Sequence, residues 1–279
     1  ENKSDIAYAN VIDHYRLHYT WLLLATFSAA LIAFAGWTGL KALISFFFSG
    51  VTILKLLLPA ILHGFDPLWT TFALVVVIAF VTIFLVGGFS RRGLVSFLGA
   101  LGGIVLTILL GSVLTGLFKI HGAVTPFTET LLYSGFDFLD LTGLFIAGIF
   151  LASSGAVMDL SINVSAAMAE IVETSPTISR GALIKSGFSV GRHVFGTMIT
   201  TLLLAYTGGY TSLIMIFIAQ GIPFENIINM IYVSAEFVHT MVGSFGMILV
   251  APVTALVGGV FFIKRKTEAA AAPKSRLIA

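Results

Sequence analysis

The chain has 279 residues, of which 58% are hydrophobic and 10% are charged, and its formal net charge is +2. A soluble protein carries about 25% charged residues, so this composition excludes a surface that is covered by water on all sides. Cysteine is absent, which excludes disulfide bonds and thiolate metal sites. The small positive charge does not indicate nucleic-acid binding, because the basic residues cluster at the ends of apolar runs.

Apolar runs of about 20 residues recur, the length that an α-helix needs to cross ~30 Å of hydrocarbon. The sequence therefore predicts an all-α fold, a polytopic transmembrane helical bundle that has the lipid bilayer as its solvent. We expect an extracytoplasmic or interfacial lead-in at residues 1–18, a transmembrane domain at 19–263 and a cytoplasmic basic tail at 264–279.

Seven spans are predicted, at residues 19–37, 42–62, 68–87, 94–118, 141–169, 188–206 and 240–263. Glycines suggest a turn at 39–41 between the first two spans and an end of the sixth span at 208–209. Residues 211–219 are apolar but too short to cross, and residues 224–239 have an amphipathic pattern. We therefore expect one re-entrant or short interfacial segment before the last span.

The fourth span carries Gly99, Gly103, Thr107, Gly111 and Thr115 at four-residue steps, which predicts a face for close helix packing. The last span carries a similar face of Ala251, Ala255 and Gly259, beside a kink expected at Pro252.

Basic residues decide the orientation. If residues 211–239 do not cross the membrane, Lys41, Arg91, Arg92, Arg180 and Lys185 lie on the same side of the membrane as the basic tail. The opposite side holds only Lys3, Arg16 and Lys119. Because cytoplasmic segments are rich in Lys and Arg, we expect the amino terminus outside and the carboxyl terminus in the cytoplasm.

Ionisable residues inside apolar spans are rare, and usually face a partner or a wet cavity. Asp159 and Asn163 share one face of the fifth span, and Arg192, Thr197 and Thr200 lie on the sixth. Asp159 and Arg192 have matched depths, so we expect them within hydrogen-bonding or one-water distance. The pair is either a structural salt bridge or a proton- or ion-linked switch, in which protonation of Asp159 releases Arg192.

His193 follows the arginine. We expect a neutral imidazole that donates one hydrogen bond to a Thr, a backbone carbonyl or Asp159. His193 either shifts the pH at which the protein responds or only packs in the core without a switching role.

Glu236 and His239 lie at the expected outer mouth of the last span, as a gate or a solvated cap. Their Glu-x-x-His spacing occurs in di-iron bundles, which need a second copy and two further carboxylates. We therefore expect no metal and no cofactor. A nucleophile turn has a glycine two residues before its serine, and Gly243-Ser244-Phe245-Gly246 lacks that glycine. A twin-aspartate intramembrane protease needs a second buried Asp, and Asp159 is alone. No enzyme is therefore predicted.

Several motifs together resemble the YibE/F family of bacterial membrane proteins, in its YibE-like branch. They are Gly155-Ala-Val-Met-Asp159, Ser189-Val-Gly-Arg192, Gly196-Thr-Met198, Leu203-Leu-Ala-Tyr206, Val242-Gly-Ser-Phe-Gly246 and Ala251-Pro-Val-Thr-Ala255. The resemblance implies a multi-pass protein of a bacterial plasma membrane, alone, as a homo-oligomer or with a YibF-like partner subunit. It also implies an extracytoplasmic domain before the first span, and His193 stands where relatives tend to have an acid. A fainter similarity is to one half of SecD/SecF and resistance-nodulation-division transporters.

These observations favour a membrane transporter or exporter of a small solute or ion, coupled to protons or ions. The alternative is a non-transporting subunit that assembles or regulates a membrane complex. A water-filled cavity that reaches the ionisable residues would favour transport.

Overall fold

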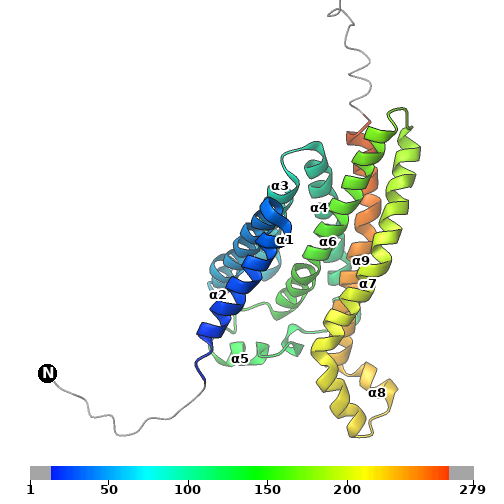
Figure 1. Ribbon diagram of the computed structural model, residues 1–279. Coiled ribbons are helices and arrows are strands. Elements are labelled where there is room, and N and C mark those ends of the chain that lie inside the picture. Colours follow the sequence, from blue (N-terminus) through cyan, green and yellow to red (C-terminus); the bar gives the residue numbers. More distant parts are fainter. Residues whose placement is uncertain (1–13, 264–279) are drawn as a thin grey trace, which may run out of the picture.

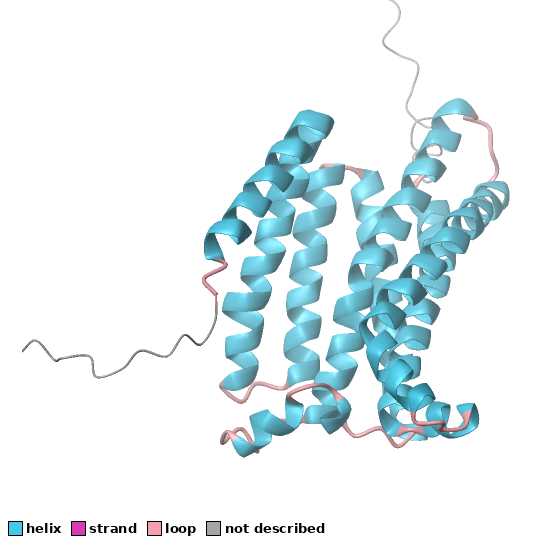
Figure 2. Ribbon diagram, turned by 60° about the horizontal axis from the view of Figure 1, so that its bottom comes forward, coloured by secondary structure: helices cyan, strands magenta, loops and turns pink. Residues whose placement is uncertain are grey.

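The computed structural model describes residues 14–263, and all of its regular secondary structure in that range is helical (Figures 1 and 2). The helices are α1 (Leu17–Val51), the π-helical η1 (Thr52–Leu57), α2 (Leu58–Leu62), α3 (Pro67–Gly87), α4 (Arg91–Leu117), the 3-10 turn η2 (Gly122–Val124), α5 (Thr128–Tyr133), α6 (Leu141–Thr174), α7 (Arg180–Ala219), α8 (Phe224–Asn229) and α9 (Ile231–Phe261). The predicted all-α bundle is therefore confirmed. The predicted tail, and most of the predicted lead-in, lie outside the described residues.

Six helical stretches between residues 14 and 263 are long and apolar enough to cross a membrane. The first of them, Leu17–Leu62, has 46 residues and folds back on itself. Gly36 has a positive φ of 55° at the reversal. The rings of Phe27 and Phe46 lie 5.9 Å apart, whereas 19 residues of straight helix would separate them by about 28 Å. The two arms are thus separate passes, which gives seven in the described part of the chain.

The turn between these two arms was expected at residues 39–41 but lies at Gly36. Only glycine adopts this positive φ without strain, which is why the chain reverses there. Gly39 also has a packing role, because a Cβ on it would come within 2.4 Å of the Leu31 carbonyl oxygen.

The core forms where α6 packs against α4 and α9. Its centre holds fully buried residues such as Ile104, Val157, Leu160, Met247 and Val250. The predicted small-residue face of α4 is confirmed, since all five of its members are buried. A Cβ on Gly103 would lie 2.0 Å from Val250 Cγ2, so α4 and α9 approach more closely than any larger residue would allow.

Helix α7 is much longer than predicted. It begins at Arg180, before the expected start of the span at residue 188, and it continues through the expected end at Gly208-Gly209 to Ala219. Its 40 residues have a length of about 60 Å, roughly twice the thickness of the hydrocarbon. Because lipid cannot satisfy free backbone groups, a helix continues through glycine there and stops only before the turn at Gly221-Ile222-Pro223.

The segment before the last span was also predicted wrongly in part. Residues 224–239 do not form one amphipathic helix, because the backbone is extended at Met230 between α8 and α9. Helix α9 therefore begins well before the predicted span, at Ile231. Residues 211–219, expected as a separate short segment, are the last part of α7, and Pro252 lies inside a continuous α9.

The seven passes give the bundle two distinct ends. In Figure 1 the connections after α3 and after α6 lie at the upper end, and α5 and α8 lie at the lower end. The upper end carries Arg91, Arg92 and Arg180, as the orientation rule predicts for the cytoplasmic side. We call this end the basic end, and the end with α5 and α8 the opposite end.

Candidate functional site

Asp159 and Arg192 do not form the direct contact that their depths suggested. No hydrogen bond or ion pair joins the two among residues 14–263. Both side chains are exposed on the surface of the bundle, as is Asn163 on the same face of α6 as Asp159. Asp159 lies 15 residues before the end of α6 and Arg192 lies 12 residues after the start of α7, so their positions along the helices are similar although the side chains do not meet. The other form of this prediction, in which one water bridges Asp159 and Arg192, stays a prediction.

The neighbouring polar residues of α7 bond to their own helix. His193 Nδ1 lies 2.7 Å from the Ser189 carbonyl oxygen. A carbonyl only accepts, so Nδ1 donates, and the predicted bond to a backbone carbonyl is confirmed. The Thr197 hydroxyl donates to the Val194 carbonyl over 3.0 Å. Thr200 is exposed on the same helix. These residues therefore do not converge with Asp159 on one site inside the chain.

A second group of polar residues does converge, near the opposite end of the bundle. On α9, Glu236 Oε2 lies 3.7 Å from His239 Nδ1, and the two side chains are only 15% and 21% exposed. The spacing of three residues places both on one face of the helix.

Two tyrosines of α7 complete this group. The Tyr206 ring lies 4.7 Å from the His239 imidazole, with Phe145 of α6 6.3 Å from the same imidazole. Tyr210, one turn further along α7, lines the same cavity as Glu236. We call Tyr206, Tyr210, Glu236 and His239 the tyrosine–acid cluster.

The cluster has unused hydrogen-bonding capacity. Tyr206 Oη and His239 Nε2 are buried and have no hydrogen-bond partner among the described residues. Buried polar atoms of this kind are uncommon, and each calls for a reason such as a proton, an ion or a water that visits the site. Tyr206 Oη would also lie 3.6 Å from a Cβ on Gly243, so this glycine leaves room beside the hydroxyl.

Two cavities lead to the cluster. The first has a volume of about 170 Å³ between α7 and α9, and it is lined by Leu203, Thr207, Tyr210, Ile214, Val233, Glu236, Phe237, Thr240 and Met241. The second has a volume of about 350 Å³ and includes Tyr210, Leu213 and Tyr232 together with residues 123–127, 129 and 130. Tyr210 lines both. The first cavity thus reaches Glu236, the second reaches the loops of the opposite end, and Tyr210 stands between them.

The sequence singled out Glu236 and His239 but missed both tyrosines. They were missed because the sixth span was expected to end at Tyr206. A signal was present, since Tyr206 and Tyr210 are four residues apart and so share one face of a helix that continues.

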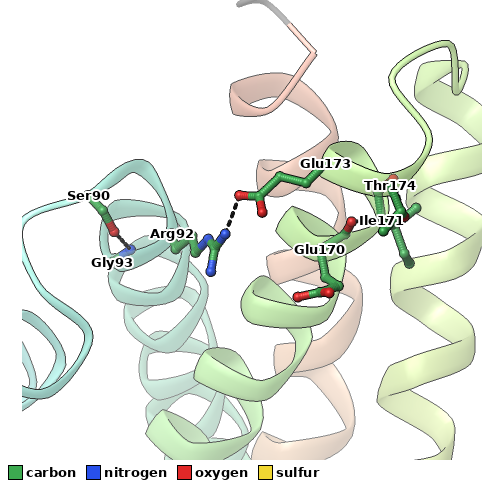
Figure 3. A network of polar contacts seen from close by, with 7 residues as sticks. All are labelled: Ser90, Arg92, Gly93, Glu170, Ile171, Glu173 and Thr174. Atoms are coloured by element: carbon green, nitrogen blue, oxygen red, sulfur yellow. Dashed lines mark hydrogen bonds and ion pairs between the residues drawn. The ribbon is translucent and has the colours of Figure 1, made fainter.

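The basic end carries a structural clamp. Figure 3 shows Arg92 at the start of α4 in an ion pair with Glu173 near the end of α6, and the Ser90 hydroxyl accepting from the Gly93 N–H. Arg91 donates to the Phe261 carbonyl at the end of α9 over 3.4 Å. Arg91 and Arg92 therefore join the ends of three helices.

No group of three or more His, Cys, Asp or Glu residues that could hold a metal occurs within residues 14–263. The paired Glu236 and His239 supply two possible ligands, fewer than a typical protein metal site uses.

The helices, their length and their apolar surface define the chain as a polytopic helical membrane protein. The sequence model described as YibE/F-like protein matches residues 23–264, a range that reaches into all seven passes, and the chain belongs to this family. Comparison with curated proteins and with solved structures gave no match.

Proposed function

We propose that this protein is a transporter that couples the movement of a small solute or ion to protons, with the tyrosine–acid cluster as its outer proton-binding group. The observation that carries the proposal is the largely buried Glu236–His239 pair, whose Glu236 lines a cavity, together with His239 Nε2 and the neighbouring Tyr206 Oη, which are buried without a partner among the described residues. Carboxyl and imidazole groups exchange protons between about pH 4 and 7. Ionisable residues at such depth mark proton or ion pathways in membrane proteins.

The packing of α7 supports a moving gate. Near the basic end, α7 lies tightly on α9, where a Cβ on Gly191 would come within 2.5 Å of Ala251 Cβ. Beyond Gly191, towards the opposite end, α7 has no buried residue. Loosely packed segments open at lower free energy than tightly packed ones. In the proposal, this outer half of α7 moves Tyr210 away from Glu236 and joins the two cavities.

The proposal keeps Asp159, Asn163, Arg192 and His193 as coupling residues at mid-depth. It also places the protein in a bacterial plasma membrane, with the basic end in the cytoplasm and no enzymatic activity. The alternative is a non-transporting subunit of a membrane complex, for which the cluster would only stabilise the packing of α7 on α9.

The experiment uses the full chain in liposomes that contain a pH-sensitive dye. A potassium gradient with valinomycin drives protons inward. We expect the native chain to acidify the lumen faster than empty liposomes, and Glu236→Gln to remove this flux. Glu225→Gln, an exposed acid on α8 at the same end of the bundle, is the matched control and should keep the native rate. A proton flux that Glu236→Gln leaves at the native rate would refute the role of the tyrosine–acid cluster as the proton-binding group.

A further inference from the structure

The outward face of α7 is polar although α7 spans the membrane. Ser189, His193, Gly196, Thr197 and Thr200 are all exposed, and none of the residues in the most apolar 18-residue window of α7 is buried. His193 and Thr197 bond to their own helix, but the charged Arg192 beside them has no such partner within the described residues, and ionised residues in membrane spans face protein or water. The described part of the chain leaves this face open over residues 189–200.

Helix α6 presents a second open face of the opposite charge. Gly155, Asp159 and Asn163 are exposed along it, and a Cβ added to Gly155 would meet no atom within 4 Å. Among residues 14–263, Arg192 on α7 is thus a cation without an ion-pair partner, and Asp159 on α6 is an anion without one. The chain itself brings neither to the other.

The two charges have closely similar depths. Asp159 lies about four turns before the end of α6 at Thr174, and Arg192 lies about three turns after the start of α7 at Arg180. Both of these helix ends lie at the basic end, joined by residues 175–179. At a rise of about 1.5 Å per residue, the charges are therefore about 22 and about 18 Å from that end. An arginine side chain can bridge the difference.

A twofold axis along the membrane normal leaves the depth of every residue unchanged. Two copies related by such an axis would bring Arg192 of one copy level with Asp159 of the other, and the reverse. A twofold interface is closed and uses the same two faces of both copies. Such an interface requires that one chain carry both complementary faces at the same depth, and the faces of α6 and α7 meet this requirement.

We propose that two copies of this chain form a dimer in which the polar face of α7 of each copy packs on the α6 face of the other. Two reciprocal Asp159–Arg192 ion pairs form across the interface. Gly155 and Gly196 let the helix backbones approach, as small residues do between membrane helices. The interface is independent of the proton-binding role of the tyrosine–acid cluster.

Charge reversal tests the pairing. Chains with Asp159→Arg and chains with Arg192→Asp are expressed together with different tags. Alone, each variant opposes like charges at both contacts, and we expect its self-association to fall by roughly tenfold or more. A mixed dimer of the two variants has both ion pairs restored, so it should form preferentially. Pairing within one chain would give no such preference, and that result would overturn the proposal.

Cysteine cross-linking tests the interface without changing a charge, in a chain with no native cysteine. One copy carries Gly155→Cys and the other Thr200→Cys; both positions lie about 29 Å from the basic ends of their helices. We expect a cross-link between the copies in lipid. Leu109→Cys, exposed on α4, replaces Gly155→Cys in the control and should give none. A monomer in lipid, or cross-links only to a different membrane protein, would refute the dimer.

Discussion

The contact of α4 with α9 depends on Gly103, and the substitution Gly103→Ala measures it. The new Cβ would lie 2.0 Å from Val250 Cγ2 and 3.2 Å from Val157 Cγ1, both on residues with no exposed surface. An added methyl in so well packed a core costs about 1–3 kcal/mol. We expect the free energy of unfolding in detergent micelles, measured by titration with a denaturing detergent, to fall by this amount.

The contact can be restored by a second change. Val250→Ala removes the methyl group that Gly103→Ala meets, so the double variant should lose less than the sum of the single losses, by about 0.5–3 kcal/mol. Gly116→Ala on the same helix is the control, because its Cβ meets nothing within 4 Å. Additive losses, or a Gly103→Ala variant as stable as the native chain, would show that α4 and α9 are not in close contact.

Gly36→Ala should cost about 1–3 kcal/mol of unfolding free energy in the same titration, because an alanine is strained at a φ of 55°. Gly50→Ala, whose Cβ also meets open space, should cost less, and equal losses would contradict the reversal at Gly36. Arg92→Gln should change stability by no more than about 1 kcal/mol, since the side chains of the Arg92–Glu173 pair are 45% and 66% exposed; a much larger loss would show that the clamp is decisive. Ile222→Cys should react with an impermeant thiol reagent from outside the cell and Pro176→Cys should not, and the reverse pattern would invert the proposed topology. His193→Asn and His193→Asp should shift the pH dependence of the proton flux in liposomes; two variants that match the native chain from about pH 5.5 to 8 would leave His193 with a packing role only.

The predicted site shows where sequence reasoning succeeds in a membrane protein. Glu236 and His239 were recognised because ionisable residues stand out in an apolar helix, and their spacing placed them on one face. Tyr206 and Tyr210 were missed because tyrosine is ordinary at the end of a span. Only the length of α7 shows that both lie within a continuing helix, where Tyr210 lines the same cavity as Glu236.

The sequence by itself indicated the all-α bundle and its long apolar helices, and it predicts their depth and orientation in the membrane. Each of these follows from position along the chain, because a helix in lipid satisfies its own backbone and rises by a constant amount with each residue. The tertiary structure decided which way each face points. The rotation of α7 is set by Gly187 and Gly191, which would clash with Ala255 and Ala251 if they carried a Cβ. This packing turns His193 and Thr200 outward, and the periodicity of one helix does not reveal which of its faces a neighbour will cover.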